Sequence, residues 1–392
     1  MRSNLSALGL VLAVAAGATG AARAAEPYDI HVILPLTGGG SFVGNGHRDS
    51  LETLAQVVNA ADGIRGRPVH FVYHDDQSSP QVAVQLANEV LADKPAVILG
   101  SGLVAMCAAI APLMKNGPVD YCLSPAYHPP AGSFVFSSSS SAIDQSSALI
   151  RYYRMEGWTR IATLNNTDAT GQANDKAIDQ VMALPENKGM TLVERQHFNP
   201  TDLSVAAQIE RIKASGAQAI VAGVTGSPAA TVFKGMVQAG LDIPVAPTSG
   251  NQTFPQMEQW KDFLPKGLVM GSALFPEHDG VWKLDPRVEA VQHEMYAALK
   301  TRGLKADNME ATSWDAGLVV IAALRALGPD ANAEQVRNYI ANLTDFAGID
   351  GMYDFKANPE RGLGAESAIV VRYDAQNKAW TWLTQPGGAP LK

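Results

Sequence analysis

A glycine-rich turn, Gly38-Gly39-Gly40-Ser41-Phe42-Val43-Gly44, follows an apolar run that ends at Leu34. At the start of a helix, such a turn can present backbone N–H groups to a small anion such as a carboxylate. The dinucleotide-binding fingerprint G-x-G-x-x-G requires glycine where Val43 stands. Asp75 and Asp76 lie too far along the chain to be the acidic residue that accompanies this fingerprint. The turn therefore argues for anion contact and against a dinucleotide cofactor.

Other residues that can do chemistry are not arranged for catalysis or metal binding. His74-Asp75-Asp76 lies on a predicted strand, where neighbouring side chains point to opposite faces and make a poor chelate. Asp76 is better interpreted as a turn and capping residue ahead of Pro80. The sequence contains no G-x-S-x-G, H-E-x-x-H, C-x-x-C or G-x-x-x-x-G-K-[ST] motif. We expect no metal, no cofactor and no enzymatic activity, with a secreted amidase or esterase as the competing hypothesis.

Cys107 and Cys122 are the only cysteines. In an exported chain such a pair favours a disulfide, and a closed loop of about 16 residues would contribute ~3 kcal/mol in the chain-entropy model. Two separately buried small side chains, or thiols that line a pocket, are the alternatives that the sequence leaves open.

The first 25 residues have the three parts of a secretory leader. Arg2 supplies the positive end, an apolar stretch runs from Leu5 to about Ala16, and Ala22-Arg23-Ala24 forms an A-x-A cleavage signal. We expect cleavage near Ala24/Ala25 and an exported, soluble mature protein, with a disordered alanine-rich N-terminus as the alternative. The net charge of −8 and the lack of a basic run argue against nucleic acid and an anionic membrane surface as partners.

Short runs rich in Val, Ile and Leu alternate with longer amphipathic segments, which is typical of a parallel sheet covered on both faces. A first set of strands is predicted at Ile30–Leu34, Val69–Tyr73, Ala96–Leu99 and Val119–Leu123. The polar stretch Phe136–Asp144 is interpreted as a linker, after which the pattern restarts with strands at Arg160–Leu164, Thr191–Gln196 and Ala219–Gly223. We therefore predict an α/β fold with two doubly wound lobes and a ligand cleft between the carboxyl ends of their strands.

Several segments resemble the leucine/isoleucine/valine-type solute-binding proteins of ABC importers, which have the type I periplasmic binding protein fold. The resemblance rests on Leu36-Thr37-Gly38, on the stretch from Asn59 to Pro68 (NAADGIRGRP), on Asp75-Asp76-Gln77 with Pro80, and on Val237–Leu241 (VQAGL). It implies two lobes joined by a multi-strand hinge, a periplasmic location, a monomer, and delivery of a small molecule to a membrane permease served by a separate ATPase. The expected lobes are 26–138 with 276–350 and 139–275 with 351–392, after a signal peptide at 1–25.

The residues that hold an α-amino acid in this family are replaced here. The family's carboxylate-binding serine and threonine fall at Val104 and His128, its ammonium-pairing acid falls near Ser249, and its tyrosine falls at Thr170. Without an acid, an ammonium would remain unpaired in a closed cleft. Asp168–Gln172, Asn251, Tyr353–Lys356 and Asn358–Gly364 instead resemble the branch that binds aromatic acids.

We therefore expect a periplasmic substrate-binding protein that captures a small organic solute, preferably an aromatic carboxylate, by hinge closure. Branched-chain amino acid or amide binding, or a sensory ligand receptor on the same fold, are the alternatives. The predicted ligand site combines possible ring contacts with polar loop residues: Phe42, Val43, Val104, Ala126, Tyr127, His128, Thr170, Thr225, Ser249, Asn251 and Phe275.

Overall fold

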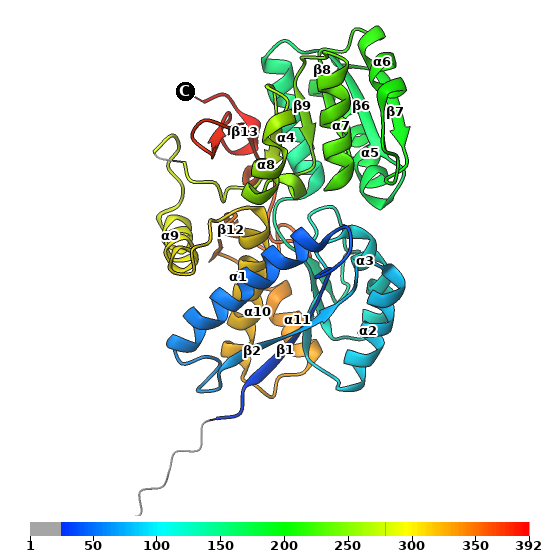
Figure 1. Ribbon diagram of the computed structural model, residues 1–392. Coiled ribbons are helices and arrows are strands. Elements are labelled where there is room, and N and C mark those ends of the chain that lie inside the picture. The colour runs from blue at the N-terminus through cyan, green and yellow to red at the C-terminus, as the bar shows by residue number, and fades with distance from the viewer. Residues whose placement is uncertain (1–24, 279, 392) are drawn as a thin grey trace, which may run out of the picture.

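The computed structural model describes residues 25–278 and 280–391, which form two α/β lobes stacked one on the other (Figure 1). The predicted leader lies outside the described residues, apart from Ala25. Lobe 1 is the lobe that contains β1, and lobe 2 is the lobe that contains β6. Both predicted parallel sheets are present, so the predicted fold class is confirmed.

Lobe 1 is built on a five-stranded parallel sheet with the order β2-β1-β3-β4-β5. Its strands are β1 (Tyr28–Leu34), β2 (Val69–Asp75), β3 (Val97–Leu99), β4 (Val119–Cys122) and β5 (Val135–Ser137). Its helices are α1 (Ser41–Ala60), α2 (Pro80–Ala92), α3 (Val104–Ile110), α9 (Pro286–Thr301), α10 (Asn308–Leu327) and α11 (Ala333–Ala341). A small antiparallel pair, β11 (Phe346–Ala347) and β12 (Met352–Tyr353), follows them.

Lobe 2 contains a four-stranded parallel sheet with the order β7-β6-β8-β9, which a bridge from Val245 to Leu268 connects to the antiparallel sheet β10-β13-β14. Its strands are β6 (Arg160–Asn166), β7 (Thr191–Phe198), β8 (Ala219–Ala222), β9 (Val245–Pro247), β10 (Val269–Ser272), β13 (Ile369–Asp374) and β14 (Ala379–Trp382). Its helices are α4 (Ala142–Met155), α5 (Ala169–Met182), α6 (Ala206–Ala214), α7 (Ser227–Gln238) and α8 (Phe254–Trp260).

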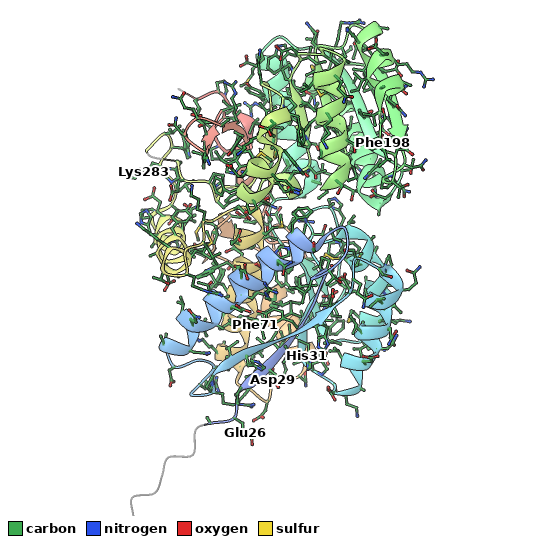
Figure 2. All side chains as sticks on the ribbon, in the orientation of Figure 1. Glu26, Asp29, His31, Phe71, Phe198 and Lys283 are labelled. Carbon is green, nitrogen blue, oxygen red and sulfur yellow. A yellow bond between two sulfur atoms is a disulfide. The ribbon has the colours of Figure 1, made fainter. Side chains whose placement is uncertain are left out.

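Each sheet is buried on both faces because side chains alternate along its strands. In β1, Ile30, Val32 and Leu34 join the core beneath α1 and α10, whereas Ile33 joins the core beneath α2 and α3. Lobe 2 has the same arrangement around β6 and β8. Figure 2 labels Phe71 in lobe 1 and Phe198 in lobe 2, which belong to two of these separate cores.

The serine-rich crossover between the lobes falls in the stretch that the sequence predicts as a linker. Phe136 lies in β5 within the lobe 1 core, and the serines that follow, 137 to 141, are buried. The Arg361 guanidinium donates to the carbonyls of Ser138 and Ser139 at 3.0 and 3.1 Å, and Ser137 Oγ donates to the Ser124 carbonyl at 2.9 Å. The stretch runs from the lobe 1 core to α4 of lobe 2, and its serines are buried because a distant arginine satisfies their backbone inside the protein.

The core in which each residue packs shows where the chain passes back from one lobe to the other. Leu274 packs in lobe 2 and Phe275 in lobe 1, close to the predicted boundary at 275/276. Tyr353, Phe355 and Leu363 all pack in the lobe 1 core, beyond the predicted boundary at 350/351. We therefore propose that the last crossover lies between Leu363 and β13. Within the described residues, no helix combines the length and apolar character needed to cross a membrane.

Candidate functional site

The candidate site is a cleft between the two lobes, with an empty volume of about 880 Å³ that includes open solvent. Lobe 1 contributes α1, the first residues of α10 and the loops after β3 and β4. Lobe 2 contributes α4, α5 and the loops after β8 and β9. These are mostly the carboxyl ends of parallel strands and the helices that follow them, where open α/β sheets bind ligands.

The glycine-rich turn is held in place by Asp75. Its Oδ1 accepts hydrogen bonds from the backbone N–H groups of Leu36 and Thr37, and its Oδ2 accepts one from Thr37 Oγ1 at 2.7 Å. A Cβ on Gly44 would lie 2.4 Å from the Pro35 carbonyl oxygen, so only glycine lets α1 approach this loop. Asp75 thus holds the two residues that lead into the glycine-rich turn. The described residues contain no cluster that could hold a metal ion.

His47 lies one helical turn beyond Val43 on α1, and both residues line the cleft. Its Nδ1 atom lies 2.9 Å from the Met309 carbonyl oxygen, which can only accept. Nδ1 therefore carries the hydrogen, and Nε2 is left as a bare acceptor with no partner among the described residues. Burial lowers the pKa of His47 to about 4, although the bond to Met309 acts in the opposite direction, so the ring is neutral at pH 7.

The orientation of His47 is fixed by close packing of α1 against α10. Ser50 Oγ donates to the Glu310 carbonyl at 2.8 Å, and a Cβ on Gly46 would lie 2.7 Å from Met309 Cβ. On the other side of the ring, a Cβ on Gly102 would lie 2.5 Å from Nε2. The imidazole is therefore held between the first turn of α10 and a position that only glycine leaves open.

Thr225 faces the cleft from lobe 2, and a chain of hydrogen bonds determines its role. Thr248 Oγ1 donates to the Val224 carbonyl at 2.9 Å, which uses its only hydrogen. The bond of 2.7 Å between the two threonine hydroxyls must then be donated by Thr225. Thr225 Oγ1 therefore keeps only lone pairs for a ligand.

Four other hydroxyls in the cleft remain able to donate. Ser124 in lobe 1 and Ser146, Thr170 and Ser249 in lobe 2 line the cleft, and their side chains bond no other described residue. Among the described residues, no Asp, Glu, Lys or Arg lines the cleft. A charged ligand group would thus meet neutral donors and acceptors rather than an opposite charge.

Six of the residues predicted from the sequence line this cleft together. They are Val43, Val104, Ala126, Thr170, Thr225 and Ser249. Phe42 lies at the side of the cleft, where its Cε1 atom would be 3.0 Å from a Cβ placed on Gly226 of lobe 2. It therefore packs between the lobes.

The remaining four predicted residues do not line the cleft. Phe275 is 1% exposed and packs in the lobe 1 core, so the structure corrects its predicted contact with a ligand. Asn251 is fully buried; its Nδ2 donates to the Val224 carbonyl at 2.8 Å and its Oδ1 accepts from Gly226 N at 2.8 Å. It supports the loop after β8 instead of reaching a ligand.

Tyr127 and His128 lie beyond the cleft, near the hinge. The Tyr127 carbonyl accepts a hydrogen bond of 2.6 Å from Arg361. Burial, together with the positive charges of Arg361 and Lys176, lowers the pKa of His128 to about 4. Because Lys176 lies on α5 of lobe 2, His128 also faces the boundary between the lobes.

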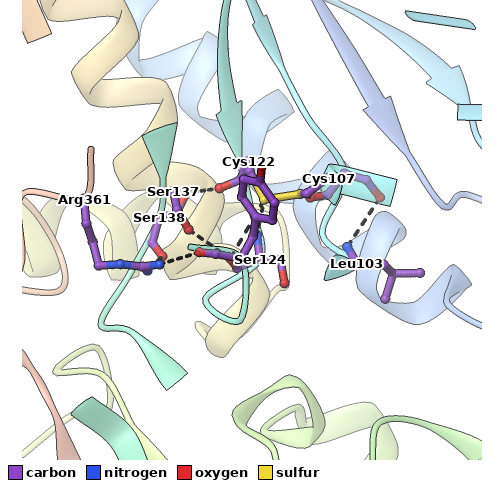
Figure 3. Close-up of a disulfide and its surroundings, with 9 residues drawn as sticks. Leu103, Cys107, Cys122, Ser124, Ser137, Ser138 and Arg361 are labelled. Atoms are coloured by element: carbon purple, nitrogen blue, oxygen red, sulfur yellow. Dashed lines mark hydrogen bonds between the residues drawn. A yellow bond between two sulfur atoms is a disulfide. The ribbon is translucent and has the colours of Figure 1, made fainter. Parts of the chain in front are cut away.

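Cys107 and Cys122 are joined in a disulfide, with their Cα atoms 5.8 Å apart (Figure 3). The bond ties α3 to the end of β4, directly before the cleft residue Ser124. Figure 3 shows Ser137 and Ser138 on the other side of this loop, with Arg361 behind them. The loop after β4 is thus anchored by a covalent bond on one side and by the hinge on the other.

The sequence analysis did not identify His47 or Asn308 as cleft residues. The signal for His47 was present, since a residue four positions after Val43 shares its face of the helix. Asn308 had no local signal, because the first turn of α10 reaches the cleft only through its packing on α1.

Comparison with known proteins gives a family match over most of the chain. A family model described as periplasmic binding protein matches residues 27–378. The "Leu/Ile/Val-binding protein homolog 3" of Brucella melitensis is 24% identical over 305 residues, which cover 76% of this chain and 79% of that protein.

Solved structures agree with this fold. An extracellular ligand-binding receptor from Rhodopseudomonas palustris has a TM-score of 0.80 at 19% identity, covering 92% of this chain and all of that one. The branched-chain amino acid transporter substrate-binding protein LivJ of Streptococcus pneumoniae, solved with isoleucine, has a TM-score of 0.77 at 15% identity, covering 91% of this chain and 99% of that one. At these identities the likeness shows a common fold.

Proposed function

The chain belongs to the periplasmic binding protein family, and from this premise we propose that it is the substrate-binding component of an ABC uptake system. It captures a small organic solute, with an aromatic carboxylate preferred, and delivers it as a monomer to a permease that a separate ATPase drives. The relatives above are named as binding proteins or receptors, which favours binding over catalysis.

The observation that carries the proposal is the uncharged cleft lined by both lobes. A solute that contacts Ser124 in lobe 1 and Ser249 in lobe 2 bridges the lobes, and it stabilises the closed state by its higher affinity for that state. The buried hinge around Arg361 connects the lobes on the side of Tyr127. Closure on a ligand is the change that the permease would recognise.

The lining of the cleft supports a carboxylate better than a zwitterion. An α-ammonium would find no carboxylate among the described cleft residues, and an unpaired charge in a closed site is unfavourable. A ligand carboxylate would find the free hydroxyls of Ser124, Thr170 and Ser249. It would also lie near the start of α3, which has no side-chain cap. Val43, Val104 and Leu149 supply apolar surface for a ring.

A thermal-shift screen tests the proposal. The mature protein is heated with benzoates, phenylacetates, branched-chain amino acids, amides and dicarboxylates, each at several concentrations. A ligand at 100 times its Kd stabilises the folded state by ~2.7 kcal/mol, and we expect aromatic carboxylates to give the largest shifts. Shifts with leucine, isoleucine or valine alone would contradict the aromatic preference and favour branched-chain amino acid binding.

A transport assay separates uptake from sensing. Deletion of the gene is expected to abolish uptake of the radiolabelled ligand, and export of the wild-type protein to the periplasm should restore it. Intact uptake in the deletion strain, with loss of a transcriptional response to the same solute, would favour a sensory receptor.

A further inference from the structure

The cleft contains a buried acceptor that no described residue uses, the Nε2 atom of His47. The side chain is 1% exposed, and its other ring nitrogen is already bonded to Met309. A buried polar atom without a partner is unfavourable, and proteins nearly always satisfy such atoms with protein, water or ligand. In a cleft that holds a solute, the ligand is the partner that remains.

Thr225 provides a second acceptor from the opposite lobe. Its hydroxyl hydrogen is used within the chain that runs through Thr248 to the Val224 carbonyl. A ligand oxygen without hydrogen would therefore face lone pairs at Thr225 as well as at His47. While His47 is neutral and Thr248 donates to the Val224 carbonyl, both atoms present lone pairs to the cleft.

We propose that His47 and Thr225 set the ligand specificity of the cleft by accepting hydrogen bonds, so that the solute carries an O–H or N–H donor in addition to its carboxylate. This inference rests on the proposed function of solute binding and adds the second functional group of the ligand. Hydroxylated aromatic acids fit both the acceptors and the donors of the cleft. Their hydroxyl can donate to His47 or Thr225, and their carboxylate can accept from Ser124, Thr170 and Ser249.

Closely matched ligands distinguish a donor from an acceptor. Methylation of a phenol keeps its oxygen but removes the hydrogen, which leaves His47 Nε2 or Thr225 Oγ1 unpaired in the complex. A site built around a hydrogen-bonded group rejects the analogue that lacks it far more strongly than an apolar pocket does. We expect the wild-type protein to prefer a hydroxybenzoate over its methoxybenzoate by about tenfold or more.

The experiment measures Kd by calorimetry for 3- and 4-hydroxybenzoate, the two matching methoxybenzoates, and the pair isobutyramide and N,N-dimethylisobutyramide. His47→Asn keeps a donor for the Met309 carbonyl but removes the acceptor at the Nε2 position, whereas His47→Gln returns an amide oxygen near that position. Thr225→Val removes the second acceptor. His70→Asn is the control, since His70 is exposed and bonds only Asp29.

A single phenolic hydrogen has one acceptor, so the preference for each hydroxybenzoate is expected to fall to about twofold or less in the variant, His47→Asn or Thr225→Val, that removes the acceptor of that hydrogen. It should recover in part in His47→Gln and stay unchanged in His70→Asn. Melting of each unliganded variant shows whether it is folded, and Thr225→Val keeps the test available if His47→Asn does not fold.

The outcomes separate the inference from the proposed function. Aromatic acids that bind with equal affinity with and without the donor, or a preference that survives both His47→Asn and Thr225→Val, would overturn the inference and leave the function standing. Binding of only the amide, with a donor preference lost in His47→Asn, would overturn the aromatic function and the requirement for a carboxylate, and it would support the acceptor role of His47. Failure of all these ligands to bind would overturn both.

Discussion

Gly102 has a direct influence on the width of the cleft. A Cβ at this position would lie 2.5 Å from both His47 Nε2 and Val43 Cγ1, closer than side-chain atoms can approach. Gly39, in the glycine-rich turn, has nothing within 4 Å of its Cβ position. The two glycines therefore differ in whether a methyl group fits, although they lie near the same end of the sheet.

Gly102→Ala is expected to weaken binding of the best ligand at least tenfold and to destabilise the protein by ~1–3 kcal/mol, because the new methyl group must displace His47 or Val43. Gly39→Ala should change the free energy of unfolding by less than ~0.5 kcal/mol and leave affinity unchanged. Calorimetry and urea denaturation measure both quantities. Equal effects of the two substitutions would show that contact with His47 does not limit the cleft.

Ser249→Glu places a negative charge where we propose that the ligand carboxylate binds. Because this position lines the cleft and Ser249 makes no side-chain hydrogen bond to a described residue, we expect the variant to fold normally. Affinity for an anionic ligand should fall about 100-fold through repulsion in a partly desolvated site. Ser249→Gln, which has the same size without the charge, is the control. Equal losses in the two variants would place the carboxylate elsewhere in the cleft.

At the scale of elements, the loop after β4 connects the cleft, the disulfide and the hinge. Cys122 ends β4, Ser124 lines the cleft, and the Ser124 carbonyl accepts from Ser137 in the crossover. The disulfide holds α3 on one side of this loop. Movement of the hinge serines is therefore transmitted to a loop that cannot separate from α3.

The double variant Cys107→Ala/Cys122→Ala tests this arrangement. Loss of a closed loop of about 16 residues should lower the free energy of unfolding by ~3 kcal/mol, measured by urea denaturation against the oxidised wild type. Reduction of the wild type should give a similar loss. Ligand affinity should fall by less than about tenfold, because neither cysteine lines the cleft. An unchanged stability would mean that the bond does not form in the isolated protein.

The elements that the sequence predicts well are those whose signal is local. The runs at β1, β2 and β8 are apolar or alternating over their own length, so periodicity finds them. The serines of the crossover look solvated in isolation, and only Arg361, more than 200 positions away, buries them. Phe275 also lacked a local signal: Leu274 packs in the core of lobe 2 and Phe275 in the core of lobe 1, because the chain crosses between the lobes here.

At the scale of the whole molecule, buried carboxyl groups give the protein a dependence on pH. Burial raises the pKa of Asp120 to about 7. Burial and the nearby charge of Asp315 also raise the pKa of Asp350. The buried His47 shifts in the other direction, and burial lowers its pKa to about 4.

The sign of each contribution follows from proton uptake. A carboxyl whose pKa is higher in the folded state stabilises the fold below its unfolded pKa of ~3.9, and this stability is lost as the pH rises through the folded value. A histidine with a lowered pKa stabilises the fold above its unfolded pKa of ~6.5 and loses this stability as the pH falls towards 4. Above pH 6.5 the contribution of such a histidine to the free energy of unfolding no longer changes with pH. Of these two kinds of group, only the buried carboxyls then alter that free energy.

We therefore expect the free energy of unfolding to decrease between pH 6.5 and 8, by at most ~1.4 kcal/mol per pH unit for each group. Asp120→Asn, which resembles the protonated acid, should make this decrease smaller. Asp242→Asn is the control, since Asp242 is exposed and only 3.8 Å from Lys266. Urea denaturation across this range provides the measurement, and a stability that rises towards pH 8 would contradict the ionisation of Asp120.

The way the chain passes between the lobes also determines the order in which the protein can be completed. Lobe 1 begins at β1 but needs α10, α11 and Leu363 for its core, while lobe 2 needs β13, which pairs with β10, and Trp380 and Trp382 from its final hairpin. Lobe 1 therefore stays incomplete until Leu363 is available, and lobe 2 stays incomplete until Trp382 is available, in a chain of 392 residues. Truncation ahead of β14 would leave lobe 2 without Trp380 and Trp382, so this lobe is the last part of the protein that can be completed.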